Sequence, residues 1–152
     1  MKREQRIAGY RSDLEGSERE RAARAQAADQ RLRDARLRLG ELEQYRRDYE
    51  QGFGRRVAGG MGGPALRDFH AFLGRLDGAI SQQKQAVARL ETERDFDQQR
   101  WRDIAVQLKA VSAVIDRWRV EERVAEGRAE QRDIDERALR GRHAASAAPA
   151  EA

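Results

Sequence analysis

The residues that most resemble a chemical motif are the glycines between positions 52 and 63, which look like a phosphate-binding loop. Such a loop needs Gly-x-x-x-x-Gly-Lys-Ser/Thr, because its backbone N–H groups wrap the phosphates, the lysine reaches them and the hydroxyl holds magnesium. Gly54 and Gly59 have the right spacing, but Gly60 and Met61 stand where the lysine and the hydroxyl are required. No strand-like run precedes these glycines, so the dinucleotide-binding pattern fails as well. A nucleotide site is therefore not favoured.

Residues for acid–base or metal chemistry do not form a site either. His70 and His143 are the only histidines and lie in different parts of the chain, which has no cysteine for a thiolate metal site. Carboxylate pairs such as Asp133 and Asp135 are frequent, but a pair on an exposed helix has no pocket to shift its pKa values. We expect no enzymatic activity, no metal and no cofactor.

Composition predicts a thin helical protein. Of the 152 residues, 38% are charged and only 6% are aromatic, which is too little apolar material for a rounded core. The net charge of +4 permits contact with nucleic acid, anionic lipid or an acidic protein. Acids and bases are interleaved, however, and such mixing makes a solvated helix face and no patch for a polyanion. With no membrane-spanning run and no signal-peptide core, a cytosolic chain is expected.

A long repeat with alternating spacings of three and four residues runs from Leu66 to Trp118. Its positions are Leu66, Phe69, Leu73, Leu76, Ile80, Gln83, Val87, Leu90, Arg94, Asp97, Trp101, Ile104, Leu108, Val111, Ile115 and Trp118. All but three are apolar, and a repeat of this length keeps one seam facing a partner helix. A fainter repeat, interrupted by Arg21, uses Ile7, Leu14, Ala25, Ala28, Leu32, Ala35, Leu39, Leu42 and Tyr49.

The glycine-rich stretch between these repeats predicts the turn of an antiparallel helical hairpin. Glycine permits the irregular backbone of a reversal, and Pro64 suits the first turn of a helix. We therefore expect an all-α fold, a two-stranded antiparallel coiled coil, as one domain over residues 1–143. Its parts would be a helix over about 2–51, a turn over about 52–63, a helix over about 64–140 and a flexible alanine-rich tail over 144–152.

The relative lengths of the helices predict an overhang of the second one. If Tyr49 lies opposite Leu66, equal rise brings the amino terminus level with about Val111 to Ala113. The second helix would then extend about 25 residues further. This segment, around 118–140, loses its apolar seam, so another protein is expected to cover it unless it frays.

Several apolar residues are not needed by the seam. Phe72 and Ala79 form a row with Leu76 and Gln83 along one flank, and the hairpin brings Tyr45 towards them. These residues either widen the core near the turn or form an exposed aromatic docking surface, since such residues are common interface anchors.

The chain resembles the flagellar FliJ protein family in the order and spacing of several elements. These are the run Leu39–Tyr49, the block Phe69–Ile80, the residues Gln83, Trp101 and Lys109, and the closing segment Glu130–Glu136. The resemblance implies a component of the flagellar type III protein export apparatus. It would be a stalk-like coiled coil that couples the hexameric export ATPase to the cytoplasmic domain of the membrane export gate and assists export chaperones.

The resemblance also implies which residues bind each partner. The gate-binding residues would be Leu42, Tyr45, Tyr49, Phe72, Leu76 and Ala79, with Arg38 and Gln83 flanking them. The ATPase-binding residues would be Ile7, Leu14, Trp118, Arg123, Gln131, Asp135 and Glu136. A monomer is expected, in the cytoplasm and recruited through its partners to the cell membrane at the flagellar base.

Two alternatives of other classes remain. A basic coiled coil could bind nucleic acid, although the interleaved acids argue against this and no nucleic acid is expected as a partner. A structural protein could instead dimerise through its long helix, with the glycines as a hinge. Molecular mass in solution separates the hairpin from the dimer, because only the hairpin satisfies its own seam as a monomer.

Overall fold

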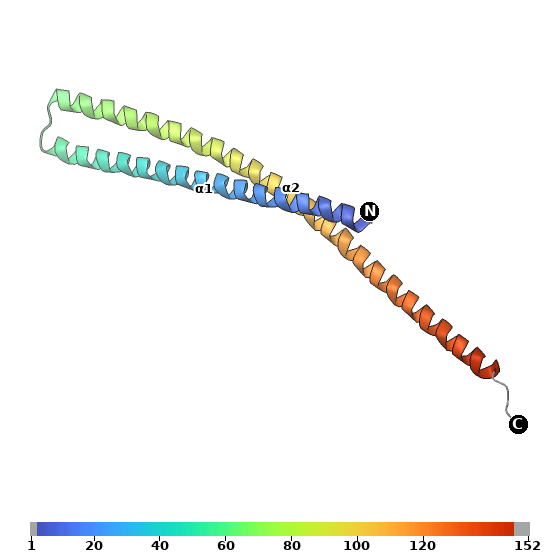
Figure 1. Cartoon of the computed structure of the whole chain (residues 1–152). Coiled ribbons are helices and arrows are strands. Elements are labelled where there is room, and N and C mark those ends of the chain that lie inside the picture. Colours follow the sequence, from blue (N-terminus) through green and yellow to red (C-terminus); the bar gives the residue numbers. More distant parts are fainter. Residues whose placement is uncertain (1–2, 148–152) are drawn as a thin grey trace. The chain divides into compact units, whose positions relative to one another are not determined.

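The computed structural model describes residues 3–147, which form two α-helices joined by a turn (Figure 1). Helix α1 covers Arg3–Ala58 and helix α2 covers Gly63–Ala147. Only residues 59–62 of the described part are not helical. The expected all-α helical hairpin is confirmed. Contacts divide the chain into two compact units, Gly16–Ala105 and Met1–Glu15 with Val106–Ala152.

In the unit Gly16–Ala105, α1 and α2 pack antiparallel along the seam that the repeats predict. Its most buried cluster contains Leu32, Ala35 and Val87, with Leu39 and Leu90 packed against it. Every repeat position of α2 in this unit except Leu66 is buried or half-buried. Small alanines supply much of the α1 side, which allows the two helices to approach closely.

Polar side chains pin the register of the same unit. The Trp101 Nε1–H donates to the Glu18 carboxylate at 2.9 Å, and Arg36 pairs with Glu91 at 3.0 Å. Because a one-turn slip would break both contacts, they favour a single alignment of the helices.

In the other unit, the start of α1 packs beside the middle of α2. Leu14 and Ile115 are buried there. The Arg3 guanidinium lies 4.3 Å from the centre of the Trp118 ring and pairs with Glu121 at 3.3 Å. Every residue from Arg119 to Ala147 is exposed.

The structure corrects three details of the expected hairpin. Helix α1 continues to Ala58, seven residues past the expected end at 51, and the turn narrows from 52–63 to 59–62. Tyr49 stacks on Phe69 and not on Leu66, so the helices are shifted by about one turn. In the other unit, Arg3 contacts Trp118 and Glu121 instead of Val111 to Ala113, so the unpaired part of α2 begins later than expected.

The carboxyl end of α2 also differs from expectation. The helix runs through Ala147 instead of ending near 140, so residues 144–147 of the expected flexible tail are helical. The rest of that tail, 148–152, and residue 2 at the expected start of the first helix lie outside the described residues. Within residues 3–147, neither helix has a stretch long and apolar enough to cross a membrane.

Candidate partner-binding surfaces

Five aromatic rings gather where the two helices meet the turn, and we call them the aromatic cluster: Tyr45, Tyr49, Phe53, Phe69 and Phe72. Phe53 and Phe69 are stacked with their ring centres 3.5 Å apart. Tyr49 also stacks on Phe69, with ring centres 5.0 Å apart. Tyr45 meets Phe72 edge to face at 6.0 Å. Such aromatic pairs stabilise beyond their burial, so the cluster fixes the end of the hairpin.

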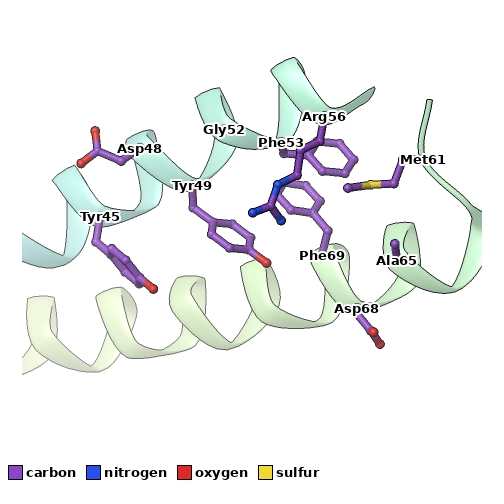
Figure 2. A pocket seen from close by; sticks show the side chains of 10 residues that line it. All are labelled: Tyr45, Asp48, Tyr49, Gly52, Phe53, Arg56, Met61, Ala65, Asp68 and Phe69. Carbon is purple, nitrogen blue, oxygen red and sulfur yellow. The ribbon is translucent and has the colours of Figure 1, made fainter. Parts of the chain in front are cut away.

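A hollow of about 460 Å³ opens beside the aromatic cluster. Tyr49, Phe53 and Phe69 form its apolar wall, while Arg56 reaches from α1 over it and Met61 borders it from the turn (Figure 2). Asp48 and Asp68 also line the hollow, but Figure 2 shows their carboxylates pointing away from the rings. The hollow therefore has an aromatic wall, with the Arg56 guanidinium above it and other polar groups around it.

The residues expected to bind the gate fall into two groups. Tyr45 is 51% exposed, and Leu42, Tyr49, Phe72 and Ala79 are half-buried beside the seam. Leu76, by contrast, is a buried core residue. Leu76 therefore belongs to the core, while Tyr45 presents a large exposed face.

The two flanking positions of this row have structural partners. Gln83 is half-buried and its Nε2 donates to the Ala35 carbonyl at 2.9 Å, across the two helices. Arg38 is exposed and lies 4.0 Å from Glu41 on the same helix. Gln83 is therefore held by the fold, whereas Arg38 stays accessible.

Sequence reasoning missed Phe53, the ring of the aromatic cluster that stacks on Phe69. It lies among the glycines that were expected to form the turn, and the structure places it on the last turns of α1. The spacing of Tyr45, Tyr49 and Phe53 is i, i+4 and i+8, which puts three rings on one helix face. That spacing is the signal that could have found it.

An ion pair spans the helices beside the aromatic cluster. Arg46 donates to both carboxylate oxygens of Asp77 on α2 and to Glu50 on its own helix. The hydrogen bond from Arg46 lowers the pKa of Asp77, and the bond to Asp77 raises the pKa of Arg46 in turn. The carboxylate thus stays charged at mildly acidic pH.

The residues expected to bind the ATPase all belong to the unit Met1–Glu15 with Val106–Ala152. Leu14 is buried, and Ile7 and Trp118 are half-buried, so these three belong mainly to the helix packing. Arg123, Gln131, Asp135 and Glu136 are exposed on α2. Gln131 donates to Asp135 at 3.0 Å, and Glu136 pairs with Arg140 at 3.5 Å. Only the second group offers a free surface.

No metal-binding group of His, Cys, Asp or Glu side chains occurs among residues 3–147. The arrangement of two long helices, an aromatic cluster at the turn and an exposed polar segment of α2 is suited to contacts with other proteins. No curated protein and no solved structure matches the chain. A family model described as Flagellar FliJ protein matches residues 12–146, nearly the whole chain. The chain therefore belongs to the flagellar FliJ family and is a component of flagellar type III protein export.

Proposed function

We propose that this chain couples the hexameric export ATPase to the cytoplasmic domain of the membrane export gate and assists the delivery of export chaperones. It would act without enzymatic activity, as a stalk-like monomer in the cytoplasm that its partners recruit to the cell membrane. Membership in the flagellar FliJ family supports a role in export. The assignment to these two partners and to the chaperones goes beyond that membership.

The observation that carries the proposal is that one ring of the aromatic cluster, Tyr45, is half exposed on a chain that is otherwise mostly polar. Tyr45 keeps half of its surface exposed while its ring packs edge to face with Phe72. A rigid tyrosine loses little conformational entropy on binding, and tyrosine is enriched among residues that dominate interface energy. We assign the gate to this face, with Leu42, Tyr49 and Ala79 around it.

The ATPase would bind the other unit through the exposed part of α2. From Arg119 to Glu136 the exposed acids and bases alternate along the helix, and the last acids pair with the arginines that follow, Asp133 with Arg137 and Glu136 with Arg140. Exposed pairs of this kind contribute little individually. Such a surface suits weak contacts with several subunits of a ring, since it does not hold any one of them tightly.

A binding titration against the purified cytoplasmic domain of the gate tests the first contact. We expect Tyr45→Ala with Phe72→Ala to weaken binding by about 2 kcal/mol or more, the loss typical of aromatic anchors. The matched control is Tyr10→Ala with Phe96→Ala, which removes a tyrosine and a phenylalanine that are equally or more exposed elsewhere. Circular dichroism checks that both double variants keep their helix content.

Three outcomes of this titration would count against the assignment. Equal loss in both double variants would mean that no specific aromatic face exists. Full binding by the Tyr45/Phe72 variant would move the site elsewhere. Duplex DNA serves as a third arm, and tight, salt-sensitive DNA binding without gate binding would favour the nucleic-acid alternative.

An ATPase assay tests the second contact. The full chain is expected to stimulate ATP hydrolysis by the export ATPase, whereas a chain lacking residues 122–147 is expected to lose most of this effect. The deletion removes only exposed residues, so the remaining helices should keep their packing. Undiminished stimulation by the shortened chain would exclude this segment as the ATPase contact.

A further inference from the structure

The charge pattern of the chain changes at the turn. Acids and bases alternate along most of both helices, but residues 51–67 contain no carboxylate, and this is the longest such run in the sequence. The same stretch contains Arg55, Arg56 and Arg67, all of them exposed. The turn end of the helix pair therefore carries only positive charge over these residues.

Exposed apolar side chains accompany these arginines. Val57 is 48% exposed and Leu66 is 40% exposed, and they flank the turn on α1 and α2 respectively. Leu66 is also the one seam position in its unit that the helix pairing leaves exposed. The stack of Phe53 on Phe69 lies directly behind the turn and holds it in place. We call Arg55, Arg56, Val57, Leu66 and Arg67 the turn surface.

Helix stability does not account for all of this surface. Arg55 and Arg56 lie in the last turn of α1, where cations favour the helix dipole. Arg67, however, lies near the start of α2, where the dipole favours an acid, and the first turn of α2 holds no acidic residue. Val57 and Leu66 also keep apolar surface that the fold leaves exposed.

We propose that the turn surface binds an anionic lipid bilayer. Arginine guanidinium groups pair with phosphate oxygens through two parallel hydrogen bonds. Exposed aliphatic side chains between such cations can enter the boundary between headgroups and acyl chains. The ligand is thus an acidic phospholipid headgroup layer, touched by both ends of the turn.

The placement of these residues favours a bilayer over an acidic peptide. Of the five members of the turn surface, only Arg56 lines the hollow beside the aromatic cluster. Arg55, Val57, Leu66 and Arg67 lie outside it, so the hollow does not gather these four side chains around an extended segment. A broad layer of phosphates can contact all of them together. This inference concerns a surface distinct from the gate and ATPase contacts proposed above.

Vesicle sedimentation of the full chain tests the proposal. We expect binding to vesicles of phosphatidylcholine with phosphatidylglycerol, little binding to phosphatidylcholine alone, and a steep decline with salt. A basic residue at an anionic membrane contributes roughly fivefold to affinity. Arg55→Gln, Arg56→Gln and Arg67→Gln together should therefore reduce binding at least about tenfold. Val57→Ser with Leu66→Ser should reduce it as well, with less effect on its salt dependence.

The matched control replaces Arg31, Arg89 and Arg102 with glutamine, because these arginines are exposed and lack a carboxylate partner within the described structure. It changes net charge by the same amount and should bind like the parent chain. Equal loss in both triple variants would show attraction by net charge alone and overturn the proposal. Equal binding to neutral and anionic vesicles would overturn it too.

Two further arms keep the outcome clear. Since the chain has no cysteine, the variant Val57→Cys can be labelled at one position with an environment-sensitive fluorophore. The emission of this label should shift to the blue when anionic vesicles are added. A label at Arg102→Cys should not respond. Inorganic phosphate at constant ionic strength should not displace the vesicles, and displacement would indicate a simple anion site. Binding of polyglutamate without vesicle binding would assign the surface to an acidic protein. No gate or ATPase is present, so failure here leaves the proposed function untouched.

Discussion

Leu32 and Leu37 show how strongly the environment of one leucine varies around helix α1. Leu32 has 0% of its surface exposed and packs against Val87, whereas Leu37 is 65% exposed. We predict that Leu32→Ala lowers the free energy of unfolding by about 2–4 kcal/mol, since it removes buried contacts and leaves a cavity. Leu37→Ala should change it by less than about 0.5 kcal/mol. Urea denaturation followed by circular dichroism compares them, and similar losses would refute the packing described for Leu32.

The pairing of Arg46 with Asp77 predicts a pH dependence. The hydrogen bond from Arg46 lowers the pKa of Asp77 in the folded state below its value in the unfolded chain. The pair therefore stabilises the fold above the ordinary carboxylate pKa, and this contribution is lost as pH falls through the lowered pKa. In Arg46→Gln the pKa of Asp77 should rise towards its ordinary value.

Carboxyl chemical shifts of Asp77 recorded by NMR against pH measure this change directly. The control Arg102→Gln removes an exposed arginine far along α2 and should leave the titration of Asp77 unchanged. An Asp77 midpoint that does not move in Arg46→Gln would mean that the pair does not persist in solution.

At the scale of elements, hydrophobic spacing was enough to predict the helix pairing. Ala28, Leu32 and Ile115 are buried at the positions that the repeats indicate. Even Arg94 and Asp97, the charged members of the repeat, are half-buried. Spacing is sufficient here because each helix has one continuous apolar stripe, and the two stripes leave water only when they face each other.

Hydrophobic spacing could not predict the length of the turn. The turn is shorter than expected, and this changes which residues of α1 and α2 lie opposite each other. Gly52 and Gly54 each cost a helix about 1 kcal/mol relative to alanine, which is why the sequence favours a turn there. Phe53, between them, gains more than this by stacking on Phe69 and burying its ring. A tertiary contact between the helices thus outweighs the low helix propensity of the glycines. The glycine pattern alone could not predict this contact. The same contact accounts for the missed part of the candidate site.

Two glycines of this region should respond in opposite ways to alanine. Gly54 lies within α1 with open space around its Cα, so Gly54→Ala should stabilise the chain by about 0.5–1 kcal/mol. Gly60 has a φ of +90°, which side chains other than glycine rarely adopt, so Gly60→Ala should destabilise it by about 1–2 kcal/mol. Thermal unfolding of the two variants decides this, and stabilisation by both would contradict the turn described here.

At the scale of the whole molecule, stability should be unevenly distributed along α2. Residues 122–147 are all exposed, and an isolated helix of this length is marginal in water. We predict rapid amide hydrogen exchange there, and exchange slower by at least about 100-fold in the half of α2 that packs on α1 within the unit Gly16–Ala105. Mass spectrometry of peptic fragments measures both segments. Comparable protection in both would show that residues 122–147 have a partner in the free protein, such as a second copy of the chain.

The four-residue turn at 59–62 also determines how the chain can reach its fold. Phe53 meets Phe69 across a short loop, whereas Arg36 and Glu91 are 55 residues apart in sequence. Loop closure costs more entropy for longer loops, so we expect the helices to zip together outwards from the turn. Phe53→Leu should then slow folding in stopped-flow experiments, while Leu32→Ala should mainly speed unfolding. The reverse pattern would refute this order. During synthesis, all of α1 is made before any residue of α2, so pairing can begin only after the turn and the first residues of α2 have emerged from the ribosome.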